Sequence, residues 1–197
     1  MLTKIVKCSI PTDKKASFSY TQQHWAALAH VNGFIGQLGG WNVEDETDAC
    51  ILALWEDGTT YQEFMKHTHD SIFYKSKQEQ TYTNLDVSTS DPSYFIGARY
   101  NYYRSSAIES RYLVKTEIEV DFYDKEDIHE MVKSLINPSY RCLSHVVSPI
   151  EHSKLVIFSL YGSACPQKTI DTFVHPNVLN ASQYIYQLEK NWNVLSN

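Results

Sequence analysis

The sequence predicts an α+β protein made of two tandem units, each with the element order β-α-β-β-α-β. Three observations lead to this fold class. Strand-like and helix-like segments follow one another in the same order twice, and the spacings between matching positions agree. The central strand-like segments are also apolar at nearly every position, as in "ACILALW" (49–55) and "KLVIFSLY" (154–161), which indicates strands that are buried on both faces.

The first unit begins with a β-branched strand that Pro11 ends. A helix follows because its apolar residues recur at steps of three and four, and Asn32-Gly33 provides the signal that ends it. Two strands, a second amphipathic helix and a strand complete the order. The predicted elements are strand 2–10, helix 14–31, strands 34–42 and 49–56, helix 60–78 and strand 81–88.

The second unit repeats this plan. Its predicted elements are strand 111–120, helix 124–136, strands 140–148 and 154–162, a helix from 167 and strand 189–196. Nineteen residues separate Asn32 from Ile51, and nineteen separate Asn137 from Val156. Two units of equal plan and equal spacing indicate a duplication.

These units define the domain organisation. We expect a first half at 1–90 with the candidate site, a connection at 91–108 and a supporting second half at 109–197. The connection is rich in Tyr, so it packs on something, either as an ordered surface segment or as an added strand or lid. A β-α-β-β-α-β unit is a ferredoxin-like sheet with both helices on one face. Two such sheets packed face to face would form a barrel within one chain and cover their second faces.

Charge and composition exclude several functions. The formal net charge is −6 and no Lys/Arg cluster is present, so we expect no nucleic-acid or membrane partner. The N-terminus lacks the pattern of a signal peptide, which predicts a cytoplasmic protein. Its cysteines are then expected to be reduced thiols: Cys8, Cys50, Cys142 and Cys165.

The first half resembles a bacterial family of unknown function, the YdbC-like proteins, and the whole plan resembles the dimeric α/β-barrel superfamily. The segments that carry the resemblance are "HWAAL" (24–28), "GFIGQLGGW" (33–41), "ALWED" (53–57) and "FMKHTHDSIF" (64–73). That superfamily includes antibiotic-biosynthesis-type monooxygenases, haem-degrading monooxygenases and stress-response proteins. The resemblance implies a barrel formed within one chain, as a monomer or a homodimer, and a ligand pocket between the sheet and its own helices.

The candidate catalytic residues are His69 and Asp70, both within the matching segment "HTHD". By helical angle, His69 lies about 40° beyond the apolar face of helix 60–78, so it is the titratable group best placed to reach a pocket. The alternative is a border histidine bonded to a neighbour, with Asp70 facing solvent. The candidate substrate-binding residues are His24, Trp25, Trp41, Trp55 and Phe64.

The glycine-rich stretch "GFIGQLGGWN" (33–42) is interpreted as a strand. It contains neither GxxxxGK[ST] nor GxGxxG, so it is no phosphate-binding loop. Gly36, Gly39 and Gly40 indicate a bulge, a bend or a close approach. A pocket beside them would gain room, with Trp41 as one wall.

Metal and haem chemistry find no support in the sequence. His67 and His69 point about 200° apart on a helix and cannot chelate one ion, so no metal site is expected. Haem-degrading relatives carry a Trp on this helix and a His about ten residues later, where this chain has Phe64 and Tyr74.

Three functions remain open. The first is a monooxygenase-like enzyme acting on a small hydrophobic or aromatic molecule without a cofactor, with His69 moving a proton. The second is a barrel that binds a hydrophobic metabolite or acts in a stress response without catalysis. The third is an interaction role without a pocket.

Overall fold

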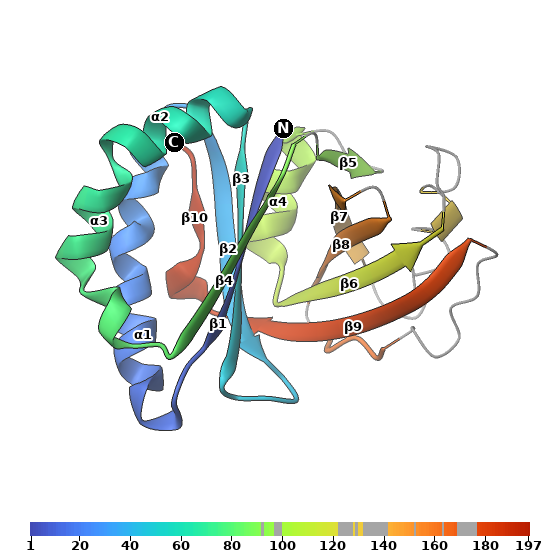
Figure 1. The fold of residues 1–197 in the computed structure, drawn as a ribbon, viewed down its shortest axis with the longest axis horizontal. Coiled ribbons are helices and arrows are strands. Elements are labelled where there is room, and N and C mark those ends of the chain that lie inside the picture. Colours follow the sequence, from blue (N-terminus) through green and yellow to red (C-terminus); the bar gives the residue numbers. More distant parts are fainter. Residues whose placement is uncertain are drawn as a thin grey trace. The chain divides into compact units, whose positions relative to one another are not determined.

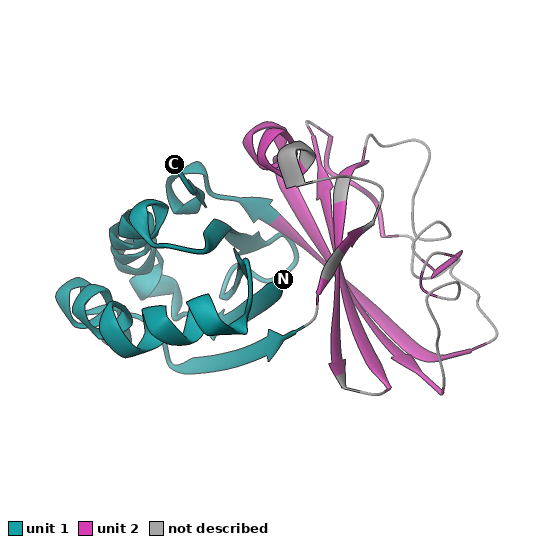
Figure 2. Cartoon of the chain, turned by 90° about the horizontal axis from the view of Figure 1, so that it is seen from above, with its two compact units in different colours: residues 1–92, 187–197 teal, residues 93–186 magenta. Residues whose placement is uncertain are grey.

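The computed structural model of the chain describes residues 1–91, 93–96, 100–121, 128, 130–131, 142–151, 153–162, 164–168 and 177–197. It has a mixed α+β fold with extensive antiparallel strand pairing. Two compact units divide it (Figure 2): unit 1 contains 1–92 and 187–197, and unit 2 contains 93–186. Residues 187–197, which the sequence division assigned to the second half, therefore group with unit 1.

Unit 1 has the predicted order β-α-β-β-α-β, and its sheet order is β4-β1-β3-β2. Its helices cover one face of this sheet (Figure 1). The elements are β1 Leu2–Ser9, η1 Thr12–Lys14, α1 Lys15–Gln22, η2 Gln23–His30, β2 Phe34–Asn42, β3 Asp48–Trp55, α2 Gly58–His67, α3 His69–Ser76, η3 Gln78–Gln80 and β4 Asn84–Ser90, followed after unit 2 by η5 Lys190–Trp192 and β10 Val194–Leu195.

The first predicted helix is divided between η1, α1 and the 3-10 helix η2. Its predicted core stripe is buried throughout, at Phe18, Thr21, Trp25 and Leu28. The helical segment ends at His30, and Gly33 adopts a φ of 74°, the left-handed conformation that glycine accepts readily. The helix stop at Asn32-Gly33 is thus placed as predicted.

The second predicted helix is broken at Thr68, whose φ of −126° and ψ of −37° lie outside the helical range. Asp57 caps α2 by accepting a 2.8 Å hydrogen bond from the Thr60 backbone N–H. A new helix, α3, begins at His69. Because the helix is interrupted before His69, the position of His69 cannot be calculated from the angles of one continuous helix.

The end of the chain differs from the predicted strand at 189–196. It consists of the short helix η5 and the two-residue strand β10, which pairs with Gln37 and Gly36 of β2. Trp192 is fully buried in a hydrophobic cluster of unit 1. The long strand at this end of the chain precedes the predicted segment, as β9 Val178–Leu188.

The glycines of β2 allow this terminal segment to pack closely against the strand. A Cβ on Gly40 would collide with the carbonyl oxygen of Gln187, and one on Gly39 would lie 3.0 Å from Cε3 of Trp192. The pairing of β2 with β3 also shifts between Phe34 and Gly36, so the predicted bulge is present. Close approach of the chain's own end, and not extra room for a pocket, accounts for Gly39 and Gly40.

Unit 2 has the strand order β9-β6-β8-β7-β5. The Tyr-rich connection forms an added strand and a helix of this unit, and the Tyr103 ring is buried 5.3 Å from the Phe95 ring. Most of the predicted helix 124–136, and most of the helix predicted from 167, lie outside the described residues. The other elements are β5 Tyr94–Ile96, α4 Tyr100–Glu109, β6 Tyr112–Val120, β7 Cys142–Glu151 and β8 Lys154–Tyr161.

Candidate functional site

Unit 1 contains a cavity of about 290 Å³ between its sheet and its helices. On the sheet side it is lined by alternate residues of β1 and β3, by Gln37 of β2, and by Leu85 and Val87 of β4. On the helix side it is lined by residues of α1, η2, α2, α3 and η3. Its position is the one that the family resemblance implied. Its size is near the lower end of ligand pockets, roughly 300–1,000 Å³, which suits a small molecule.

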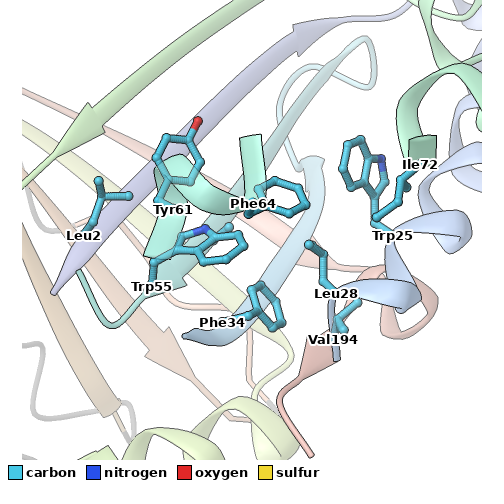
Figure 3. Packing of buried hydrophobic residues seen from close by; sticks show 10 residues of the cluster. Leu2, Trp25, Leu28, Phe34, Trp55, Tyr61, Phe64, Ile72 and Val194 are labelled. Atoms are coloured by element: carbon cyan, nitrogen blue, oxygen red, sulfur yellow. The ribbon is translucent and has the colours of Figure 1, made fainter. Parts of the chain in front are cut away.

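Aromatic rings form much of the cavity wall. The Trp55 ring lies 4.8 Å from that of Phe64 and 5.6 Å from that of Tyr61, and Figure 3 shows these three rings grouped together, with Trp25 entering from η2. Such a wall suits a flat, apolar ligand. The aromatic side chains that line the cavity are Trp25, Trp55, Tyr61, Phe64, Phe73 and Tyr82.

His69 is among the residues lining this cavity. Its ring stacks on Phe73 at 5.7 Å and lies 5.6 Å from the Trp25 ring. Only 18% of its side chain is exposed. Its Nδ1 lies 2.9 Å from Oδ1 of Asp70. Because an ionised carboxylate only accepts hydrogen bonds, this pair assigns the proton to Nδ1 and leaves Nε2 available to a ligand.

Trp25 is held in place over the cavity by a residue from a distant part of the chain. Its Nε1–H donates a 2.8 Å hydrogen bond to Oε1 of Gln78, which is 5% exposed. Gln78 follows the left-handed residue Lys77 that ends α3. The contact therefore links η2 to the end of the second helical segment.

The structure brings together Trp25, Trp55, Phe64 and His69 of the predicted set and separates the other three. Trp41 packs against Phe18 and Trp192 in a different cluster. His24 faces the Thr21 carbonyl oxygen and the Tyr20 ring. The Asp70 side chain is 72% exposed and reaches the site only through His69.

Lys4 is the main lining residue that the prediction missed. It lies on β1 between Leu2 and Val6, on the face of the sheet that the helices cover. Its Nζ lies 5.8 Å from the centroid of the Tyr61 ring. Desolvation by burial lowers the pKa of Lys4 to about 8. The period-two pattern of β1 could have revealed it, because a lysine there replaces an apolar residue on the buried face.

The polar lining is completed by amides, and none of the residues that line the cavity, all of them described, is a carboxylate. Gln37 of β2 is 5% exposed, and its Nε2 donates to the Trp192 carbonyl oxygen at 3.3 Å. The Trp55 side chain is 1% exposed, and its Nε1–H has no hydrogen-bond partner in the described part of the chain. The cavity thus presents amides, an indole N–H and a cation, with no fixed negative charge.

A second polar cluster lies in unit 2. His145 Nε2 is 3.3 Å from the Cys142 sulfur, and its Nδ1 is 2.7 Å from the Ser159 hydroxyl. Desolvation lowers the pKa of His145 to about 4, so its imidazole is neutral at pH 7.

Three further features bear on the possible functions. Within the described ranges, no group of three or more His, Cys, Asp or Glu side chains could hold a metal ion. No helix among the described residues is long and apolar enough to cross a bilayer. The four cysteines, all of them described, form no disulfide.

Two solved structures of other proteins resemble this chain. Over its whole length the chain is similar to a candidate monooxygenase from Fusobacterium nucleatum subsp. nucleatum (TM-score 0.69, 15% identity, 98% of this chain and 94% of that one). It is also similar to a candidate monooxygenase from Lactobacillus acidophilus NCFM (TM-score 0.66, 12% identity, 98% and 95%). At these identities the likeness shows a shared fold and no more.

The first 90 residues are also similar to known sequences. Residues 2–90 match the model of a domain of unknown function, DUF4937. The uncharacterised protein YdbC of Bacillus subtilis (strain 168) is 33% identical over 90 residues, which cover 45% of this chain and 76% of YdbC. The matched region contains all of the cavity lining. The chain belongs to the DUF4937 family, together with YdbC.

Proposed function

We propose that the cavity of unit 1 is the active site of a monooxygenase-like enzyme that oxidises a small, electron-rich aromatic molecule with dioxygen and needs no resident cofactor. The observation that carries this proposal is the position of His69, a titratable group on the wall of a small cavity and among aromatic rings. Two solved structures of the same fold are candidate monooxygenases, which supports the reaction class.

The proposed reaction begins with proton transfer to Nε2 of His69. Removing a proton from a benzylic or phenolic position gives an electron-rich anion, which can react with dioxygen. For a ring CH₂ group, one oxygen atom becomes the product carbonyl and the other leaves as water with the two hydrogens. The rings of Trp25 and Phe64, 5.6 and 5.8 Å from the imidazole, would hold the substrate flat beside it.

Asp70 is assigned the role of a positioning residue. It contacts the site through the 2.9 Å approach of its Oδ1 to Nδ1 of His69, which fixes the tautomer in which Nε2 accepts the proton. Because the Asp70 side chain is 72% exposed, water weakens this interaction. We expect Asp70→Asn to reduce turnover less than His69→Ala does.

Oxygen uptake with a panel of quinols and anthrone-type substrates tests the proposal. We expect His69→Ala to lower kcat at least about 100-fold, the usual contribution of a general base. His67→Ala is the matched control, because His67 is exposed and pairs with Glu63 at 3.2 Å on α2. If the wild type takes up oxygen and His69→Ala takes it up at the same rate, the proposal is contradicted.

The largely apolar lining favours a second candidate function, a binding protein for a hydrophobic metabolite. Apart from Lys4 and His69, the cavity presents mostly aromatic and aliphatic side chains, which retain an apolar ligand without altering it. Native mass spectrometry of the protein purified from its host distinguishes the two functions. A bound ligand together with no oxygen uptake on any substrate would assign the binding role.

We further propose that the two units arose by duplication and that the chain forms the barrel by itself. The strand orders support this, because β9-β6-β8-β7 repeats β4-β1-β3-β2. The β7–β8 pairing also shifts between Cys142 and Ser144, at the place where the β2–β3 pairing shifts between Phe34 and Gly36. A crystal structure with helices after both β6 and β8 would support the duplication, and loops in both places would contradict it.

A further inference from the structure

The cavity contains a cation and a buried donor that lie side by side. Lys4 pairs with Ala53 across β1 and β3, and Leu2 pairs with Trp55. Lys4 and Trp55 are therefore diagonal neighbours on one face of the sheet, with Cα atoms about 7–8 Å apart. Tyr61 lies above both: Nζ of Lys4 is 5.8 Å from its ring centroid, and the Trp55 ring is 5.6 Å away. We name this pair, Lys4 and Trp55, the donor corner.

Neither member of the donor corner has a carboxylate partner in the cavity. The Trp55 Nε1–H is buried and has no hydrogen-bond partner among the described residues, although buried donors are nearly always satisfied. No carboxylate lines the cavity to neutralise Lys4, and a desolvated charge ordinarily requires a partner. The other titratable groups that line the cavity are Cys8 on β1, Tyr61 on α2, His69 on α3 and Tyr82 before β4.

We propose that the donor corner binds the deprotonated oxygen of an aromatic hydroxyl, so that the substrates of this site are phenols or enolisable aromatic ketones. A phenolate has one oxygen, which one ammonium and one indole N–H can satisfy. A carboxylate has two oxygens and about four acceptor positions, more than these donors supply. The delocalised charge of a phenolate also suits the aromatic walls around it. Lys4 thereby becomes a substrate-binding residue of the proposed reaction.

The donor corner and His69 lie at the two ends of one row of aromatic rings, where one would bind the substrate oxygen and the other would accept a proton. Phe64 contacts both, at 4.8 Å from the Trp55 ring and 5.8 Å from the imidazole. An enolisable ketone stacked along this row would have its oxygen at Lys4 and would release a proton of its ring CH₂ group to His69. Negative charge that develops on the oxygen would be met by donors already in place. This inference rests on the proposed function, because it assigns the substrate class of the same cavity.

Binding of 2-naphthol tests the inference directly, since naphtholate has its own absorbance. We expect the wild type to prefer naphtholate over neutral naphthol by about 10- to 100-fold, the effect of one or two charge-assisted hydrogen bonds. The apparent pKa of the bound probe would then fall by about one to two pH units. Lys4→Met and Lys4→Gln should abolish this preference. Lys7→Met is the matched control, because Lys7 lies on the same strand and points to the opposite face of the sheet.

Further binding measurements distinguish failure of this inference from failure of the proposed function. 2-Methylnaphthalene, which cannot ionise, reports whether the cavity binds an aromatic ring at all. If both probes bind and the naphthol pKa is unchanged, the donor corner is refuted while the cavity stands as an aromatic site. If Lys4→Met retains the preference for naphtholate and His69→Gln removes it, the anion binds at the imidazole. That result would also refute the donor corner. If neither probe binds, both proposals fail.

Discussion

The indole Nε1–H of Trp25 donates to Oε1 of Gln78 at 2.8 Å, across 53 residues of sequence. Both residues are buried, and the hydrogen bond holds the Trp25 ring against one side of the cavity. Gln78 can do this because Lys77, at φ 54°, turns the chain back at the end of α3. The aromatic wall therefore depends on a polar contact beneath it.

Gln78→Leu should lower the free energy of unfolding by about 1–3 kcal/mol, because it leaves the buried indole N–H without an acceptor. Trp25→Phe also removes the hydrogen bond. Urea unfolding of the two single variants and the double variant gives a double-mutant cycle. We expect a coupling energy of about 0.5–1.5 kcal/mol, and additive effects would show that the contact does not contribute to stability.

Gly40→Ala should destabilise the protein by about 1–3 kcal/mol, the usual effect of overpacking. Its Cβ would meet the backbone of Gln187 and Leu188, which has no rotamer with which to move away. Gly162→Ala is the control, because a Cβ there meets nothing within 4 Å. Thermal melts should show a lower Tm for the first variant and an unchanged or slightly higher Tm for the second. Equal effects would contradict the close approach.

Lys4→Met should stabilise the protein in the absence of ligand, and the gain should depend on pH. Burial lowers the pKa of Lys4 from 10.5 to about 8, so below pH 8 the folded state must keep a desolvated charge. The gain should therefore be full below pH 8 and decline between pH 8 and 10.5, where the folded state releases its proton before the unfolded state does. Tm measured across this range tests the prediction, and a lower Tm at pH 7 would contradict it.

His145 should make stability fall as the solution becomes acidic. Burial lowers its pKa from 6.5 to about 4, so between these values the unfolded chain binds a proton that the folded chain does not. Stability should be lost as the pH falls from 6.5 towards 4, by up to about 1.4 kcal/mol per pH unit. His145→Gln, which can still reach Ser159, should flatten this slope in urea unfolding. An unchanged slope would show that folding does not lower the pKa of His145.

Much of unit 1 follows from local sequence patterns. The strands predicted at 34–42 and 49–56 agree with β2 and β3 to within one residue at each end. The helix stop at Gly33 and the buried stripe from Phe18 to Leu28 also follow from spacing alone. These features depend on neighbours a few residues apart, which periodicity describes.

The errors involve contacts between distant segments. Trp41 was expected in the pocket, but its partner Trp192 comes from the terminal segment, and no local pattern shows that contact. The break in the second helix at Thr68 was also missed, because the apolar positions continue across it. Lys4 is a different kind of error, because the period-two pattern of β1 places it on the buried face and could have revealed it.

A crystal structure of the chain soaked with 2-methylnaphthalene tests the central claim, that the cavity of unit 1 is a site for small aromatic molecules. The account predicts one ring system between β1 and β3 on one side and η2, α2 and α3 on the other, in contact with Trp55 and Phe64. A cavity that holds no ring at saturating probe, or whose side chains have collapsed into it, would contradict the account.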